Sequence, residues 1–188
     1  MAARMFTAVL PPRDVVDALD QLVEPRREAD PALRWTRPDG WHVTTSFMER
    51  VDGARVEALE ENLAAAAART APFHLTLAGG VAFPHPAKAK VLGLAVASGH
   101  DPLSHLSSAA RTAATTAGIE VDGARFVGHL TLARAYRGVS ATRWLEILSS
   151  FPAWEWRVDE LGLVESHQTG RRYEVIGRFG LGTETALD

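Results

Sequence analysis

The sequence predicts an α+β protein of two lobes, in which antiparallel-rich sheets with flanking helices surround a central cleft. Short strand-like stretches alternate with amphipathic helical stretches along the 188 residues. A His-x-Thr motif starts at His42 and again at His129, 87 residues apart, which is about half the chain. A duplicated unit in each lobe would place the two motifs face to face. Because no Pro-, Gly- or Ser-rich linker divides the chain, we expect one bilobal domain over residues 1–188.

The first half of the chain carries five strand-like stretches and two helical ones. The expected strands are residues 4–10, 35–37, 42–50, 73–77 and 91–96. The first helix follows Pro11-Pro12, and its apolar residues recur at the spacing of one helix face. The second begins at Asp52-Gly53 and runs to about residue 69. This half therefore alternates strands and helices in the way that an α+β fold requires.

The second half repeats the alternation. Asp101-Pro102 is typical of a helix start, with an acid as N-cap and proline in the first turn, and this helix runs to about residue 117. Ser140 is the expected cap of a short helix. The strands are residues 127–136, about 154–164 and 172–181, and a turn around Thr169-Gly170 separates the last two. The total is about eight strands and four helices.

Composition excludes several classes of protein. The chain is 46% apolar and 23% charged with a net charge of −3, as in globular proteins, and it has no overall basic excess for non-specific duplex binding. The absence of cysteine excludes disulfides, thiol nucleophiles and Cys-ligated zinc or iron–sulfur clusters. We find neither a signal-peptide core nor an apolar run of about 18 residues, and so expect no membrane association and a cytoplasmic location.

Because side chains alternate along a strand, the His and the Thr of each His-x-Thr motif project from the same face. Side chains at i and i+2 project to the same side about 6.6–6.8 Å apart, so each His leaves the strand beside its Thr. Two opposed motifs would surround a tetrahedral anion with two imidazoles and two hydroxyls. A neutral imidazole accepts a proton from water, a protonated one donates to the leaving oxygen, and hydroxyls hold the non-bridging oxygens. This chemistry requires no metal.

A third motif of the same spacing, His74-Leu75-Thr76, shows that spacing alone is a weak signal. It lies in an ordinary half-buried strand without a symmetric counterpart, so we interpret His74 as a surface histidine. Two other function classes stay open on the residues alone. One is a zinc hydrolase with His42, His74 and His129 as ligands, which a chelator would inactivate. The other is a noncatalytic module that binds RNA ends or nucleotides.

Further features accompany the two motifs in a fixed order. They are Phe6 to Pro12, Arg34-Trp35, Gly80 to Pro84, the segment HLTLAR from His129 to Arg134, Glu165-Ser166, Gly170 and Tyr173. Together they resemble the RNA 2′,3′-cyclic phosphodiesterase or 2′-5′ RNA ligase family of the 2H phosphoesterase superfamily over nearly the whole chain. Thr45 departs from the usual leucine of that family, and Gly128 stands where proline is common.

The resemblance implies a 2H phosphoesterase-like fold and hydrolysis of 2′,3′-cyclic phosphates to 2′-phosphomonoesters. It implies His42 as the acid that protonates the leaving 3′ oxygen and His129 as the base that activates water. Thr44, Thr131 and Arg134 would bind the phosphate. Strict alternation turns Arg134 away from the other side chains, so its role requires a bulge, a twist or the end of the strand.

The same resemblance sets the expected partners. These are RNA ends or nucleotides that carry a 2′,3′-cyclic phosphate. We expect no cofactor, no metal and a monomer. The alternative activity at the same site is 2′-5′ RNA ligation or 2′-5′ phosphodiester cleavage.

Overall fold

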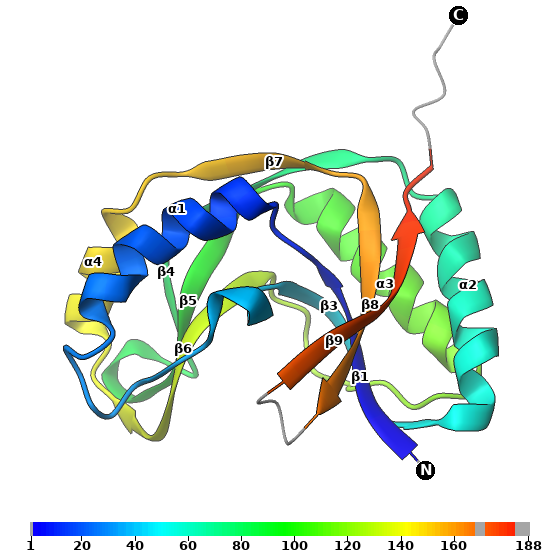
Figure 1. The fold of residues 1–188 in the computed structure, drawn as a ribbon, viewed down its shortest axis with the longest axis horizontal. Coiled ribbons are helices and arrows are strands. Elements are labelled where there is room, and N and C mark those ends of the chain that lie inside the picture. The colour runs from blue at the N-terminus through cyan, green and yellow to red at the C-terminus, as the bar shows by residue number, and fades with distance from the viewer. Residues whose placement is uncertain (1, 168–171, 183–188) are drawn as a thin grey trace, which may run out of the picture.

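The computed structural model describes residues 2–167 and 172–182, and this part contains nine strands and four α-helices (Figure 1). The strands are β1 Ala2–Val9, β2 Arg34–Trp35, β3 Val43–Asp52, β4 Phe73–Phe83, β5 Ala89–Ser98, β6 His129–Val139, β7 Trp154–Val158, β8 Glu160–His167 and β9 Arg172–Gly180. The helices are α1 Arg13–Val23, α2 Val56–Ala68, α3 His100–Thr116 and α4 Thr142–Ser149. The expected α+β class is confirmed.

The nine strands form one curled antiparallel sheet in the order β7-β4-β5-β6-β3-β1-β8-β9, with β2 paired to β6. The sequence predicts two sheets, and the structure joins them through a single pair, Val43 with Leu130. The contact is this short because β2 occupies the same edge of β6 three residues further on, at Ala133 and Arg134. Two halves of four strands each therefore meet at the His-x-Thr motifs.

The core lies between the sheet and the helices. Along α1 the buried residues are Val15, Leu19 and Val23, which recur every four positions and form one face. Figure 1 shows α1 and α4 beside one half of the sheet and α2 and α3 beside the other. Val43 and Leu130 point into this core with no exposed surface, so the neighbours of each along its strand face the opposite side. Among the residues described, no helix is both long and apolar enough to cross a bilayer.

The element boundaries differ from expectation in the second half. The expected strand at 154–164 is two strands, β7 and β8, interrupted at Asp159. Helix α3 begins at His100 after Gly99, whose φ of 86° needs a residue without a side chain, so Asp101 lies in the first turn instead of at the N-cap. Helix α4 begins without a side-chain cap from Ser140. The expected turn at Thr169-Gly170 falls outside the described residues.

Candidate active site

Both His-x-Thr motifs meet where the two halves of the sheet join. Because Val43 lies opposite Leu130, extending the antiparallel register by one residue in each direction sets His42 opposite Thr131 and Thr44 opposite His129. Side chains directly opposite have Cβ atoms about 4.5–5.5 Å apart, and diagonal neighbours such as the two histidines are separated by roughly 7–8 Å. All four side chains are partly buried. The structure thus brings these four predicted residues together on one face of the sheet.

The two imidazole rings are held in the same way. His42 Nδ1 lies 2.7 Å from the carbonyl oxygen of Gly40, and His129 Nδ1 lies 2.8 Å from that of Val127, two residues before the histidine in each case. A carbonyl only accepts, so Nδ1–H must donate in both rings. Nε2 is then the unprotonated nitrogen of each neutral ring, and it is the one available to a substrate.

Aromatic side chains pack against both rings. Phe6 on β1 stacks on His42 with ring centroids 4.4 Å apart, and Tyr173 on β9 meets the same ring edge-on at 5.3 Å. Phe83 at the end of β4 lies 4.7 Å from the ring of His129. The sequence does not predict these contacts, although all three aromatic residues lie within the segments that carry the family resemblance. They restrict how each imidazole can turn and shield it from water.

The surroundings of the rings lower both histidine pKa values. Burial lowers the pKa of His42 to about 4; the hydrogen bond to Gly40 opposes this effect, and the positive charges of Arg134 and His129 add to it. Burial also lowers the pKa of His129, with Arg134 acting in the same direction. Both imidazoles are therefore neutral at pH 7 in the unliganded protein, and a bound anion would raise both pKa values.

A β-bulge after each motif reorients the following residues. The register between β5 and β6 leaves Leu132 as an extra residue, so Leu132 and Ala133 are both buried and Arg134 returns to the face of His129 and Thr131. Of the three possibilities that the sequence leaves open for Arg134, namely a bulge, a twist or the end of the strand, the structure has the bulge. The register between β1 and β3 leaves Thr45 as the extra residue, at the matching place after Thr44.

The buried threonine that departs from the family pattern is satisfied by hydrogen bonds. Thr45 Oγ1 lies 2.6 Å from Thr7 Oγ1, which is also 2.7 Å from Ser46 Oγ. The hydroxyl of Ser107 on α3 donates to the Thr45 carbonyl over 2.5 Å. The core therefore accommodates Thr45, because the polar groups that it buries have hydrogen-bond partners.

The third His-x-Thr motif lies apart from the other two. His74 is exposed on β4, where it pairs with Arg157 on β7. Across residues 2–167 and 172–182, no group of three His, Asp or Glu side chains is placed to hold a metal ion. The alternative zinc site of His42, His74 and His129 is therefore not formed, and His74 is the surface residue that the sequence predicts.

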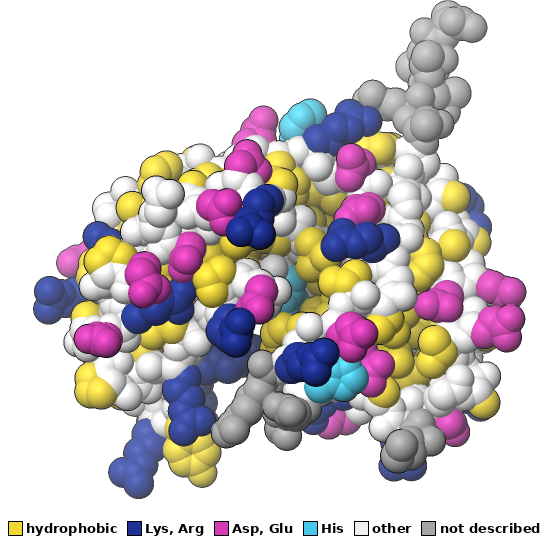
Figure 2. Space-filling model, viewed as in Figure 1, with side chains coloured by type: hydrophobic (Ala, Val, Ile, Leu, Met, Phe, Trp, Pro, Cys, Tyr) yellow, Lys and Arg dark blue, Asp and Glu magenta, His cyan; other side chains and the backbone are white. Residues whose placement is uncertain are grey.

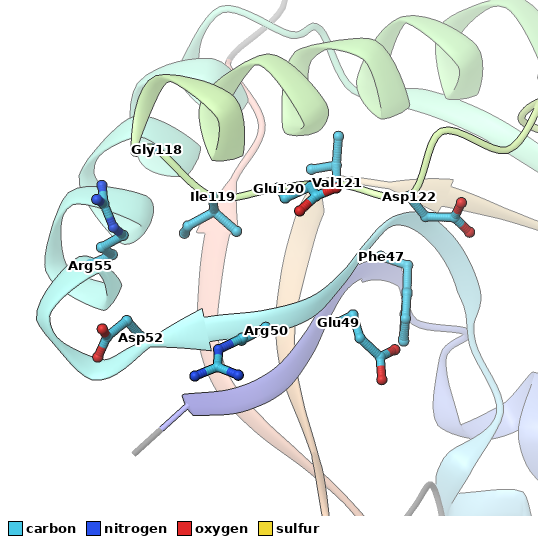
Figure 3. A pocket seen from close by; sticks show the side chains of 10 residues that line it. All are labelled: Phe47, Glu49, Arg50, Asp52, Arg55, Gly118, Ile119, Glu120, Val121 and Asp122. Atoms are coloured by element: carbon cyan, nitrogen blue, oxygen red, sulfur yellow. The ribbon is translucent and has the colours of Figure 1, made fainter.

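A separate pocket of about 680 Å³ opens between β3 and the segment after α3 (Figure 3). Phe47 and Glu49 line one end, and Asp52 and Arg55 line the other. Neither histidine contributes to it. Glu49 pairs with Arg4, and Arg55 donates to the carbonyl of Ala117 over 2.8 Å. Two of the charged groups around this pocket are thus already engaged in structural contacts.

Comparison with solved structures identifies the fold. E. coli LigT, crystallised with 3′-AMP, gives a TM-score of 0.75 at 24% identity, over 96% of this chain and 99% of the other. The protein TT0787 of Thermus thermophilus gives 0.75 at 23% identity, over the same shares of the two chains. These likenesses extend over both halves of the sheet, as the resemblance in sequence implies.

Comparison with known sequences identifies the family. RNA 2′,3′-cyclic phosphodiesterases from Geobacillus stearothermophilus and Aquifex aeolicus (strain VF5) are 29% and 27% identical over 154 residues, which cover 80% and 79% of this chain. The matches cover 48% of the first relative and 82% of the second, so the chain spans about half the length of the Geobacillus protein. The family model of the 2′-5′ RNA ligase superfamily matches residues 11–170. The chain belongs to the 2′-5′ RNA ligase superfamily.

Proposed function

We propose that this protein is a metal-independent 2′,3′-cyclic phosphodiesterase that opens the cyclic phosphate at RNA or nucleotide ends and leaves a 2′-phosphomonoester. The observation that carries the proposal is the matched pair of histidines, each with Nδ1 bound to a carbonyl, Nε2 free and a threonine beside it. The activity named for the two relatives supports it. Since all five site residues come from one chain, a monomer is sufficient.

The proposed reaction is an in-line displacement at phosphorus. Nε2 of His129 accepts a proton from water while the water oxygen forms a bond to phosphorus. The bond between phosphorus and the 3′ oxygen breaks, and that oxygen takes a proton from Nε2 of His42. The hydroxyls of Thr44 and Thr131 donate to the non-bridging oxygens, and Arg134 balances their charge. Proton exchange with solvent then restores both rings.

The acid role of His42 depends on the bound substrate. With a pKa of about 4 in the free protein, His42 is neutral at pH 7 and cannot donate. A phosphodiester anion beside the ring favours its protonated form and raises that pKa. The assignment of acid to His42 and base to His129 follows the family resemblance.

The same residues support 2′-5′ ligation as a second candidate, which the description of the matching family model favours. A 5′-hydroxyl would take the place of water, lose its proton to one histidine and attack phosphorus, while the 3′ oxygen leaves as before. The product is a 2′-5′ phosphodiester. Cleavage of that linkage is the reverse of the same steps.

The product isomer tests the proposal. Purified protein is incubated with a nucleoside 2′,3′-cyclic phosphate in excess EDTA, and the product is compared with the 2′- and 3′-monophosphates by chromatography. We expect only the 2′ isomer, at a rate that EDTA leaves unchanged. A 3′ product, or loss of activity in EDTA that added metal restores, would contradict the proposed mechanism. A second reaction, with an added RNA that has a 5′-hydroxyl end, compares the yield of the ligated product with that of the hydrolysed product.

A further inference from the structure

The Ser and Thr side chains that are buried in the described part of the chain form one group on the core side of β3. They are Thr7 on β1, Thr45 and Ser46 on β3, and Ser107 on α3, each at most 2% exposed. Charged side chains are spread over the face shown in Figure 2, whereas these four hydroxyls lie where water does not reach them. Burying a hydroxyl costs free energy unless it is hydrogen-bonded. The group lies next to Thr44, the expected phosphate ligand.

Three of the four hydroxyls join the β-bulge of β3 to β1. Thr44 pairs with Ala8 and Ser46 with Thr7, so Thr45 has no partner on β1. Two residues of the bulge therefore lie opposite the single residue Thr7. The Thr7 hydroxyl is 2.6 Å from that of Thr45 and 2.7 Å from that of Ser46. Both residues of the bulge are thus hydrogen-bonded to the residue that faces them.

The corresponding bulge of β6 is held by backbone atoms instead. Its extra residue is Leu132, whose carbonyl accepts from the backbone N–H of Thr36 over 2.8 Å. On β3 the equivalent carbonyl is that of Thr45, and it accepts from the hydroxyl of Ser107. Because β3 leaves β6 after Val43, β6 supplies no N–H to Thr45. The first His-x-Thr motif therefore depends on side chains for a contact that the backbone makes in the second.

We infer that Thr7 and Ser107 are positioning residues, which hold the bulge of β3 so that the Thr44 hydroxyl points at the substrate phosphate. The inference rests on the proposed function and adds to it two buried residues that touch no substrate. Thr44 shares a peptide bond with Thr45, whose side chain bonds to Thr7 and whose carbonyl bonds to Ser107. Without these bonds the bulge can shift, and Thr44 turns with it. A displacement of about 1 Å can lower a rate by as much as about 10²-fold.

Double-mutant cycles with Thr44 test the inference. We expect Thr7→Val, which keeps the shape of the side chain, and Ser107→Ala each to lower kcat/KM for uridine 2′,3′-cyclic phosphate at least about tenfold. In a Thr44→Val background the same changes should cost less than about twofold, because no hydroxyl is left to position; independent sites would give equal losses in both backgrounds. Thr7→Ser keeps the hydroxyl and should retain the activity.

The stability control is Val51→Ala. Val51 lies further along β3 and has no exposed surface, so its truncation destabilises the same core and leaves the bulge in place. We expect this variant to keep its kcat/KM. Urea unfolding shows that each variant is folded under the assay conditions, and Ser107→Ala carries the cycle alone if Thr7→Val does not fold.

The outcomes separate the positioning role from the activity. Equal losses with and without the Thr44 hydroxyl, or full activity in both single variants, overturn the inference and leave the phosphodiesterase standing. If the wild-type protein does not hydrolyse the substrate, the proposed function fails, and the same cycle is measured on the Kd of uridine 2′-monophosphate by calorimetry. Weaker binding that disappears in the Thr44→Val background then supports the positioning role. Equal losses in both backgrounds, or no binding by the wild-type protein, overturn it.

Discussion

At the scale of single residues, the two histidines differ from His74 in what holds their rings. In His42 and His129, Nδ1 is hydrogen-bonded to a backbone carbonyl, and an aromatic side chain packs against the imidazole ring. His74, in contrast, is exposed on β4. We predict that His42→Ala and His129→Ala each lower kcat about 10²–10⁴-fold, because each removes one proton transfer. His74→Ala is the matched control and should keep full activity. Steady-state kinetics on a cyclic nucleotide measures all three, and an active His42→Ala protein would remove that residue from the mechanism.

A substrate with a better leaving group separates the acid from the base. A cyclic phosphate whose 3′ oxygen is replaced by sulfur leaves without protonation, since a thiolate is a far weaker base than an alkoxide. We therefore expect this substrate to restore most of the activity of His42→Ala and little of that of His129→Ala. The reverse pattern, rescue of His129→Ala and not of His42→Ala, would exchange the two roles.

The buried imidazole of His42 also makes stability depend on pH. Its pKa is about 4 in the folded protein and 6.5 ordinarily, so between these values the unfolded chain binds the additional proton. The free energy of unfolding is therefore highest above pH 6.5 and falls as the pH drops toward 4, by about 3 kcal/mol for this group. Urea unfolding at pH 7.5 and pH 4.5 measures the loss. His42→Gln cannot titrate, and an equally large loss in that variant would assign the effect to other groups.

At the scale of elements, the strand that carries His129 depends on the close approach of β5. Gly93 lies opposite Thr131, and a Cβ there would fall against the carbonyl oxygen of Leu130, inside van der Waals contact. Leu130 is the residue that joins the two halves through Val43. Backbone cannot move aside as a side-chain tip can, so a methyl group at Gly93 must push β5 and β6 apart.

We therefore predict that Gly93→Ala lowers the free energy of unfolding by about 1–3 kcal/mol, as overpacking does in a tightly packed interior. It should also lower kcat/KM, because β6 carries three of the five site residues. Gly123→Ala is the control, since nothing lies within 4 Å of a Cβ at that position. Urea unfolding and kinetics on the same preparations test both parts. If the two variants have the same free energy of unfolding, β5 can move away from β6 without a loss of stability.

At the scale of the whole molecule, the sequence predicts the elements and the site better than it predicts their connections. Apolar periodicity and helix start signals located all four helices, because these patterns are local, and the repeated motif indicated that His42 and His129 face one cleft. The joining of two sheets through Val43 and Leu130 depends on which edge β2 occupies, and no local pattern records that. Arg134 needed a bulge whose place is fixed by strand register, and the aromatic contacts to the histidines come from strands distant in the sequence.

Because so few contacts join the two halves of the sheet, we predict that a ligand bound between them stabilises the protein. A phosphate held between Thr44 and Thr131 connects β3 to β6, whose own pairing is a single residue pair, so it should stabilise the whole protein against unfolding. At 100 times its Kd, a nucleoside 2′-monophosphate adds about 2.7 kcal/mol, which raises Tm by about 5–10 °C for a chain of this length. Scanning calorimetry measures the rise, with the unphosphorylated nucleoside as control. Thr44→Val and Thr131→Val should each reduce the rise in Tm, because each removes the phosphate-binding hydroxyl from one half of the sheet. If only one of the two variants reduces the rise, the ligand is held by that half alone.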